Sequence, residues 1–283
     1  MTLSVIIVNF RNPALLRLSL RSLARELADA AYEYEVIVID SASTPETRNV
    51  VRDEGGQVLN RISLIPFTEN TGYTRGVNEG LRRSHGQYML ILNPDIVPTP
   101  GSIDALMTYL REHPRCGLAG PGLLNFDDTR QDSAFRFYTP LTMLARRIGF
   151  PGARALSDRF VLRDRDLTAN GPVDWLMGSA LMVRRDSLER IGLMDERFFL
   201  YLSGVDWAWR FWENAMTVDY VPCALMYHYH RRESKGRLGV FELLLRPQAR
   251  WHLADAVKYF RKHGISGNRP SVTHEVQPTL MTA

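Results

Sequence analysis

Short apolar runs alternate with helical patterns over the first 115 residues of this chain. Apolar, partly β-branched segments at 4–10, 34–40, 62–67 and 88–92 predict strands. Apolar residues at helical spacing predict helices over 15–27, 46–54 and 103–113, and the glycine-punctuated segment 70–80 leads into another. Strands that alternate with helices predict an α/β fold, in which helices flank a mostly parallel sheet and the crossovers are right-handed.

The pattern changes after residue 115. Loops rich in Asp, Arg and Gly dominate 125–170, regular structure is predicted again at 175–184, and helices are predicted from Asp186 and over 205–213. Residues 241–263 predict one or two amphipathic helices. We therefore expect one large domain over 1–235, C-terminal amphipathic helices over 236–265, and a flexible tail over 266–283.

The composition is that of a folded protein. With 283 residues, 45% of them hydrophobic and 23% charged, the chain can bury one large core. Cys116 and Cys223 lie far apart in no metal-ligand spacing, which predicts neither a disulfide framework nor a zinc site. No apolar stretch approaches membrane-spanning length, and the first residues resemble a strand more than a signal peptide. We expect a cytoplasmic protein, whose membrane contact, if it has one, is peripheral on the cytoplasmic face of the inner membrane.

The formal net charge is only +4, but basic residues cluster in the C-terminal half. Such a surface suits a phosphorylated substrate, an anionic membrane or a nucleic acid. A solvated charged face without a partner is an equal alternative. Because the basic residues lie outside any recognisable nucleic-acid reading module, we expect no nucleic-acid partner.

Polar residues follow three of the predicted strands. They are Asn9, Asp40, and the pair Asn93 and Asp95. Ligands of open parallel sheets bind at the carboxyl ends of the strands, where these side chains should gather. Asp40 could accept hydrogen bonds from a ribose or a base, although a capping role is equally plausible. Asp95 offers a hard oxygen ligand for Mg²⁺ or Mn²⁺ on a diphosphate, although Asn-Pro-Asp is also a common turn.

Other candidate residues lie further along the chain. Glycines in segment 70–80 could let the backbone approach a phosphate, but the Gly-Lys end of a P-loop is missing. Arg75 could pair with a diphosphate or be a surface cation. His228 could complete a metal site with Asp95, although a lone histidine is more often structural. Asp206 lies among aromatic residues, where burial could make it a base.

Seven segments, in order, resemble the inverting nucleotide-sugar glycosyltransferases of family 2, which have the GT-A fold, and especially their bacterial rhamnosyltransferase branch. The segments are SVIIVNF at 4–10, VIVIDSAS at 36–43, NTGYTRGVNEG at 70–80, LILNPDIVP at 90–98, QDSAFRFYTP at 131–140, VDWLMGSALMVRR at 173–185 and GLMDERFFLYLSGVDWAWR at 192–210. Each alone is weak, but the ordered set is specific and extends over about residues 3–235.

The resemblance implies a role for each matching residue. Asp40 would bind the base or ribose, with Asn9 and Phe10 near a uracil or thymine ring. The pair Asn93 and Asp95 would be this branch's form of the Asp-x-Asp motif, with Asp95 and His228 at the metal. The rest of the donor pocket would be lined by Asn70, Gly72, Arg75 and Asn78, and the acceptor side by Trp175 and Gly178.

One motif departs from the family pattern. Relatives carry Phe-Phe-x-Tyr-x-Glu-Asp-x-Asp here, and their Glu-Asp supplies the catalytic base. This chain has Ser203 and Gly204 in its place. Asp206 is the nominated base, with Asp174 and Asp195 in reserve.

These features predict an inverting hexosyltransferase. The resemblance favours transfer of L-rhamnose from dTDP-rhamnose to a saccharide or lipid-diphosphate-linked acceptor, with Mg²⁺ or Mn²⁺, in bacterial cell-surface polysaccharide synthesis. A catalytically weakened nucleotide-sugar or glycan-binding protein is the alternative. A nucleotidyltransferase is disfavoured because its glycine-rich first loop is missing. The C-terminal helices could bind a membrane surface, pack on the core or form a homo-oligomer.

Overall fold

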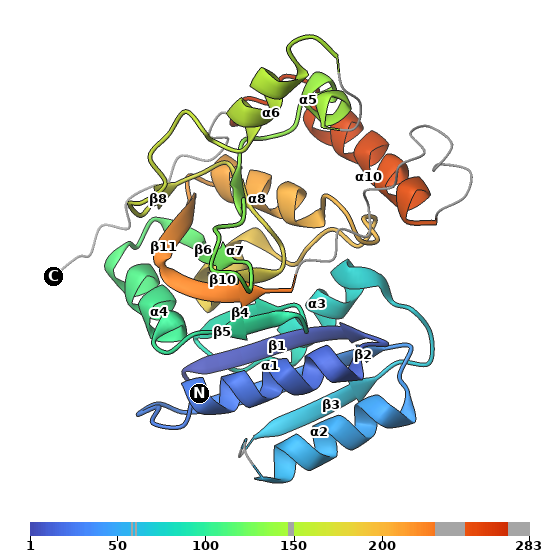
Figure 1. Ribbon diagram of the computed structural model, residues 1–283, viewed down its shortest axis with the longest axis vertical. Coiled ribbons are helices and arrows are strands. Elements are labelled where there is room, and N and C mark those ends of the chain that lie inside the picture. Colours follow the sequence, from blue (N-terminus) through green and yellow to red (C-terminus); the bar gives the residue numbers. More distant parts are fainter. Residues whose placement is uncertain (58, 60, 147–149, 230–246, 271–283) are drawn as a thin grey trace, which may run out of the picture.

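The computed structural model of this chain is an α/β fold with helices on both faces of a central sheet (Figure 1). It describes residues 1–270 except 58, 60, 147–149 and 230–246. The strands are β1 (Leu3–Phe10), β2 (Tyr34–Ser41), β3 (Ile62–Pro66), β4 (Tyr88–Leu92), β5 (Ile96–Pro98), β6 (Cys116–Leu124), β7 (Ala134–Phe135), β8 (Gly171–Pro172), β9 (Trp175–Leu176), β10 (Ala180–Arg184) and β11 (Thr217–His228). The helices are α1 (Pro13–Glu26), α2 (Pro45–Gln57), α3 (Gly72–Arg83), α4 (Ser102–Glu112), α5 (Pro140–Ala145), α6 (Ala153–Phe160), α7 (Arg185–Ile191), α8 (Ser203–Glu213) and α10 (Pro247–His263).

The strand order brings the carboxyl ends of β2, β1 and β4 to one edge. In the main sheet the order is β3-β2-β1-β4-β10-β6-β11-β5, with β8 beside β11. β1 pairs in parallel with β2 and β4, in registers that set Asn9 opposite Asp40 and Ile7 opposite Leu92. β1 therefore lies between β2, which carries Asp40, and β4, which ends three residues before Asp95.

The predicted α/β class, with helices flanking a central sheet, is confirmed, but the sheet is mixed and not mostly parallel, because antiparallel pairings join β10, β5 and β8 to it. Two long strands were not predicted. β6 and β11 pair in parallel with each other, and β10 runs antiparallel between β4 and β6. Residues 241–246 of the predicted C-terminal helices lie outside the described residues, whereas α10 covers the rest of that prediction.

Alternate residues of the central strands pack against opposite helix layers. Val5 and Ile7 belong to the core formed with α1, α2 and α4, whereas Ile6 and Val8 belong to the core formed with α3, α7 and α8. Strands buried on both faces are expected to be apolar throughout, which explains the continuous apolar runs in the sequence.

The C-terminal helix is part of the second core. Ala256 and Tyr259 of α10 are buried in the same cluster as Trp207 of α8. Beyond the helix, Arg269 Nε donates to Asp174 Oδ1 at 2.7 Å. The described part of the predicted tail, residues 266–270, therefore lies against the large domain, and the predicted domain boundaries stay predictions.

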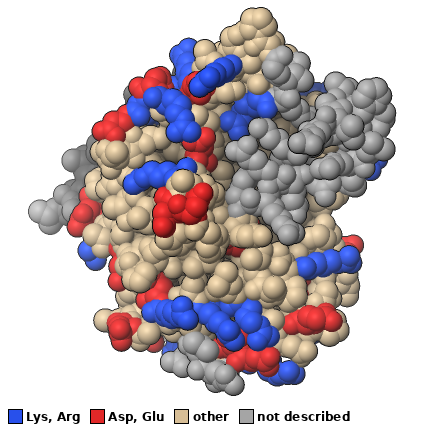
Figure 2. Space-filling view, in the orientation of Figure 1, with Lys and Arg blue, Asp and Glu red and all other residues tan. Residues whose placement is uncertain are grey.

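Charged side chains of both signs share the face drawn in Figure 2. Described Lys and Arg side chains form several separate groups there, with acidic side chains beside most of them. None of the described helices has the length and apolar character needed to cross a bilayer.

Candidate active site

Asn9 and Asp40 form a buried pair where β1 and β2 end. Asn9 Nδ2 donates to Asp40 Oδ1 at 2.8 Å, and both residues are 0% exposed. Asn9 Oδ1 and Asp40 Oδ2 have no hydrogen-bond partner among the described residues. Buried oxygens of this kind are costly unless a ligand or an ordered water satisfies them. The pair can therefore accept further hydrogen bonds, and Phe10 beside it is about half exposed.

The start of α3 requires a glycine. Gly72 has φ +72°, and a Cβ there would lie 2.5 Å from the backbone O of Phe199. Asn70 Oδ1 accepts from Gly72 N at 3.0 Å, which fixes the entry into the helix. Arg75, one turn further, is half exposed and pairs with Glu69 at 3.7 Å. This segment lies beside the 199–201 loop, and its arginine remains accessible to a ligand.

Asn78 connects α3 to the loop before α8. Its Nδ2 donates to the backbone O of Met194 at 2.8 Å and to Glu196 Oε1 at 2.9 Å, and its Oδ1 accepts from Met194 N at 3.0 Å. Both ends of the amide are thus used by the protein. These contacts favour a structural role for Asn78 over the expected place in the donor pocket, and the donor role stays a prediction.

Asp95 and His228 come from distant parts of the chain and meet beyond β4. His228 Nε2 lies 3.6 Å from Asp95 Oδ2, and Tyr229 N donates to the backbone O of Asp95 at 2.9 Å. His228 is buried, whereas 22% of the Asp95 side chain is exposed. The predicted pairing of these two residues is therefore present in the structure.

Gln131 orients the His228 imidazole. Its Nε2 donates to the backbone O of His228 at 2.8 Å and to Asn125 Oδ1 at 2.7 Å, so its Oε1 faces His228 Nδ1 at 2.8 Å. An amide oxygen only accepts, so Nδ1 carries the proton and Nε2 is directed at Asp95. Metal-binding histidines are commonly held in this way by a partner on the other ring nitrogen.

The pair suits a divalent ion that is shared with a phosphate. Asp95 Oδ1 is buried without a hydrogen-bond partner among the described residues, and its other oxygen faces the imidazole. No group of three or more metal-ligating side chains occurs in the described part of the chain. Mg²⁺ typically takes one or two protein carboxylates and completes its shell with substrate phosphates and water, so a two-residue site is compatible with it.

Trp175 and Gly178 belong to a segment that contacts the end of β4. Trp175 stacks on Phe135 with ring centroids 4.4 Å apart, and its Nε1 donates to the backbone O of Arg136 at 2.8 Å. The Tyr73 hydroxyl donates to the backbone O of Gly178. Asn93 N donates at 2.8 Å to the backbone O of Ser179, the residue after Gly178. Segment 175–179 therefore joins the end of β4 to an aromatic wall formed by Tyr73, Phe135 and Trp175.

The nominated base, Asp206, is enclosed between α8 and α10. It is 0% exposed, with Lys262 Nζ at 2.6 Å and His263 Nε2 at 2.7 Å from Oδ1. Burial raises the pKa of Asp206, but the hydrogen bonds from His263 and Lys262 outweigh it and hold that pKa below its usual range. A fully buried, ion-paired carboxylate is a poor proton acceptor for an acceptor sugar, so the contacts favour a structural role and the base assignment stays a prediction.

The two reserve carboxylates are also engaged. Asp174 accepts from Phe137 N at 2.9 Å and from Arg269. The hydrogen bonds from Arg197 and Lys262 hold the pKa of Asp195 well below its usual range despite burial. Neither carboxylate lines the pocket formed by Trp175 and the start of α8.

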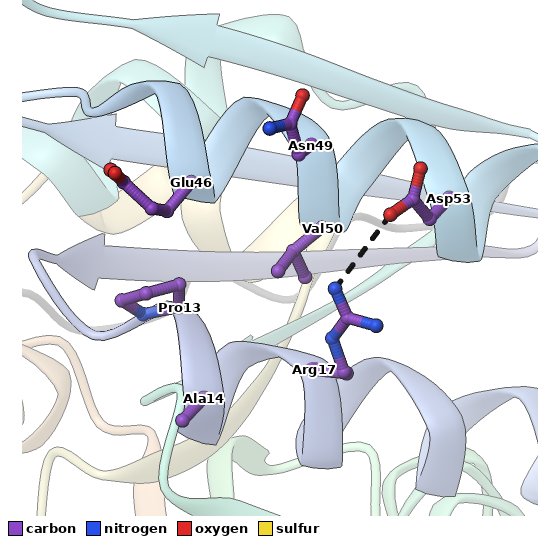
Figure 3. A pocket seen from close by; sticks show the side chains of 7 residues that line it. All are labelled: Pro13, Ala14, Arg17, Glu46, Asn49, Val50 and Asp53. Atoms are coloured by element: carbon purple, nitrogen blue, oxygen red, sulfur yellow. Dashed lines mark ion pairs between the residues drawn. The ribbon is translucent and has the colours of Figure 1, made fainter.

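A larger pocket of about 390 Å³ lies elsewhere, between α1 and α2 (Figure 3). Its lining side chains all come from these two helices, and Arg17 pairs across it with Asp53 at 3.7 Å. None of its lining residues belongs to the site formed by Asn9, Asp40, Asp95 and His228.

Sequence reasoning assigned no role to Gln131 or Tyr73. Both lie inside the matched segments QDSAFRFYTP and NTGYTRGVNEG. Their roles depend on contacts with residues about 100 positions away in sequence, which spacing along the chain does not reveal.

The fold is that of the GT-A glycosyltransferases. The structure of the mannosyltransferase PcManGT from Pyrobaculum calidifontis, solved with GDP-Man and Mn²⁺, matches with a TM-score of 0.61 at 18% identity. The match covers 95% of this chain and 65% of that protein, so the chain spans about two thirds of the solved enzyme. At this identity the likeness supports the fold alone.

This chain belongs to glycosyl transferase family 2, whose family model matches residues 4–192. It is 31% identical over 222 residues to an N-acetylglucosaminyl-diphospho-decaprenol L-rhamnosyltransferase of Mycobacterium tuberculosis, covering 71% of this chain and 68% of the relative. It is 23% identical over 242 residues to rhamnosyltransferase WbbL of Escherichia coli, covering 83% of this chain and 85% of that protein. It is thus a glycosyltransferase with rhamnosyltransferase relatives.

Proposed function

We propose that this chain is a metal-dependent, inverting hexosyltransferase. It moves L-rhamnose from dTDP-rhamnose to a saccharide or lipid-diphosphate-linked acceptor in bacterial cell-surface polysaccharide synthesis. The names of the two rhamnosyltransferase relatives support this donor sugar, and the name of the mycobacterial one supports an acceptor with a lipid diphosphate. The GDP-Man and Mn²⁺ bound to the mannosyltransferase neighbour support a nucleotide-sugar donor and a divalent ion, Mg²⁺ or Mn²⁺.

The observation that carries the proposal is the placement of Asp95 beside His228 at the carboxyl end of the sheet. The two side chains lie 3.6 Å apart, Gln131 sets the imidazole tautomer, and Asp95 Oδ1 has no partner among the described residues. A divalent ion bound there would neutralise charge on the departing nucleoside diphosphate.

The remaining donor contacts follow from the geometry of the strand ends. Asn9 and Asp40 each have one oxygen without a partner among the described residues, and these oxygens would accept hydrogen bonds from the ribose or base. The exposed ring of Phe10 would stack on the base. Arg75 would pair with the diphosphate. Asn93 and the turn at Asn70 and Gly72 would shape the pocket through their backbone.

The acceptor would bind against the aromatic wall. Trp175 and Gly178 line a pocket together with the first residues of α8. Holding an acceptor hydroxyl there, beside segment 93–95, would convert a bimolecular displacement into a positioned one, which is a large source of acceleration in enzymes.

The test combines donor binding with transfer. Wild type and Asp95→Asn are titrated with dTDP-rhamnose in a thermal-shift assay, with and without MnCl₂, and then incubated with an alkyl-diphosphate-linked N-acetylglucosamine acceptor. We expect Mn²⁺-dependent stabilisation and product with wild type, and neither with Asp95→Asn. Asp158→Asn, whose carboxylate is half exposed and pairs with its helix neighbour Arg154 at 3.8 Å, is the control. Full transfer by Asp95→Asn would refute the metal assignment.

A second candidate function is that of a catalytically weakened nucleotide-sugar or glycan-binding protein. It is favoured by Ser203 and Gly204, since no carboxylate is among the described residues that line the acceptor pocket. Donor binding without hydrolysis or transfer would establish it over the enzyme.

Peripheral contact with an anionic membrane completes the proposal. On α10, Leu253 and Val257 are 48% and 42% exposed at i, i+4 spacing, with the exposed Lys258 and Arg261 close by in sequence. Apolar side chains beside basic ones favour an anionic interface, such as the cytoplasmic face of the inner membrane. Flotation with anionic liposomes tests it, and failure of the protein to float at low salt would exclude it.

A further inference from the structure

A pocket of about 170 Å³ lies between the start of α8, segment 175–178 and α10. Its wall includes Tyr73, Tyr138, Trp175, Ser203, Gly204 and His252. Gly178 also lines it, and the backbone O of the next residue accepts from Asn93 N at 2.8 Å. The pocket therefore adjoins the segment to which the proposed function assigns the donor diphosphate.

The α8 side of this pocket has room but no carboxylate. A Cβ at Gly204 would meet nothing within 4 Å. Leu202, just before the helix, has φ +61°, a conformation that is uncommon for a residue with a side chain and often occurs at functional sites. The left-handed backbone at Leu202 thus lies next to an open space at Gly204. A catalytic base would have to come from another part of the pocket wall.

Among the described residues that line the pocket, His252 is the only imidazole. The other polar side chains there are tyrosines and a serine. Burial raises the pKa of Tyr73 and of Tyr138, so neither ionises near neutral pH. Serine is not a base without a partner that removes its proton. An imidazole, with an ordinary pKa of about 6.5, is the side chain best suited to accept a proton near pH 7.

α10 is anchored so that His252 stays at the pocket. One turn further along the helix, the Asp255 carboxylate accepts from Leu200 N at 3.3 Å and from Tyr201 N at 3.1 Å. Asp255 is buried, and the Lys258 ammonium lies 3.0 Å from it. The His252 ring lies edge-on to Tyr201, with centroids 4.9 Å apart. The helix α10 and the 199–201 loop are therefore joined next to the imidazole of His252.

We propose that His252 is the general base of the transfer reaction, an inference that rests on the proposed function. An imidazole nitrogen takes the proton of the acceptor hydroxyl, and the oxygen lone pair forms the bond to the anomeric carbon. The bond from that carbon to the phosphate oxygen breaks, and its electron pair leaves with the nucleoside diphosphate. The imidazolium then releases its proton to water. A helix outside the family-matched residues 4–192 would thus supply the group that Ser203 and Gly204 do not.

The test replaces the base and then restores one from the other side of the pocket. We measure donor affinity, kcat for transfer from dTDP-rhamnose with MnCl₂, and its pH profile, for wild type, His252→Gln, and His252→Gln combined with Gly204→Asp. General bases contribute about 10²–10⁴-fold, so His252→Gln should lose at least about 100-fold in kcat while donor affinity stays within about threefold. The added carboxylate should recover at least a tenth of the lost rate and shift the rising limb of the profile to lower pH.

His85→Gln, at an exposed histidine far from the pocket in sequence, is the control and should behave as wild type. His252→Gln with the kcat and pH profile of wild type would overturn the role of His252 and leave the proposed function standing. An equal loss of donor affinity and kcat in His252→Gln would also overturn the role of His252 as a base, because such a loss would indicate a structural role. If wild type binds the donor but neither hydrolyses nor transfers it, the proposed function fails, and the base assignment fails with it.

Discussion

His263 Nε2 lies 2.7 Å from Asp206 Oδ1, where the end of α10 meets the first turn of α8. Lys262 Nζ lies 2.6 Å from the same oxygen, and Arg210 Nε lies 3.3 Å from the other. Two cationic side chains and an imidazole thus surround one fully buried carboxylate. This junction attaches the C-terminal helix to the domain at the end opposite His252, so it supports the pocket without taking part in it.

Asp206→Asn should destabilise the protein strongly. Removing one partner of a buried ion pair leaves the other charges uncompensated, which typically costs about 3–5 kcal/mol. Because Lys262 retains some exposure, we expect the lower end of that range, about 3 kcal/mol, in urea unfolding followed by circular dichroism. The exposed pair of Arg154 and Asp158 gives the matched control, since Asp158→Asn should change the free energy of unfolding by less than about 0.5 kcal/mol. Equal effects of the two variants would contradict the structural role of Asp206.

The same junction should weaken in acid. The folded-state pKa values of Asp206 and Asp195 both lie below the unfolded value of about 3.9. A carboxyl group with a depressed folded pKa contributes stability that is complete above its unfolded pKa and is lost as the pH falls through the folded one. The difference in unfolding free energy between wild type and Asp206→Asn should therefore be constant above about pH 5 and shrink below about pH 4. A difference that grows towards low pH in urea titrations would show the opposite linkage.

The first half of the fold could be predicted because its central strands β1, β2 and β4 are apolar on both faces. Segments 4–10, 34–40 and 88–92 show this continuous pattern, and the structure places strands there. β6 was missed because Gly117, Gly120 and Pro121 argue against a strand. The packing explains the two glycines, since a Cβ at Gly117 would lie 2.5 Å from the Phe211 ring and one at Gly120 would lie 2.9 Å from Leu176. Tertiary contacts of this kind are not visible in a propensity pattern.

The candidate site was predictable only in part, for a similar reason. Strand-end residues such as Asp40 and Asp95 could be found, because parallel strands bring their carboxyl ends to one edge. The environment of Asp206 could not be found, because two of its three partners, Lys262 and His263, lie more than 50 residues away on α10. The same limit applies to His252, which reaches its pocket only through the packing of that helix.

Gly72→Ala should disrupt the junction between α3 and the 199–201 loop. A left-handed backbone costs a residue with a Cβ about 1–2 kcal/mol, and the new methyl group would also clash with the backbone O of Phe199. That oxygen accepts from Tyr73 N at 3.0 Å, so a backbone shift would break this bond as well. We expect a loss of more than about 2 kcal/mol. Gly101→Ala, at φ +80° with nothing within 4 Å of the new Cβ, isolates the conformational term and should lose only about 1 kcal/mol.

Gln131→Met should weaken the binding of Mn²⁺ without unfolding the protein. Methionine has nearly the shape of glutamine but cannot accept the hydrogen bond from His228 Nδ1, so the imidazole loses the contact that directs Nε2 at Asp95. Loss of such an outer partner typically reduces metal affinity by about 10–100-fold. Isothermal titration of MnCl₂ into the protein saturated with dTDP measures this change directly.

The control for this prediction lies in the same turn. Asp127 is exposed and hydrogen bonds to Thr129 within the turn, so Asp127→Asn perturbs the loop without touching the imidazole. We expect its affinity for Mn²⁺ to stay within about twofold of wild type, since it removes neither a metal ligand nor a partner of one. Wild-type affinity in Gln131→Met, with His228→Ala abolishing binding, would mean that the imidazole binds the ion without help from Gln131. If Gln131→Met and His228→Ala both bind Mn²⁺ with wild-type affinity, His228 is not a metal ligand, and Asp95 and the diphosphate hold the ion.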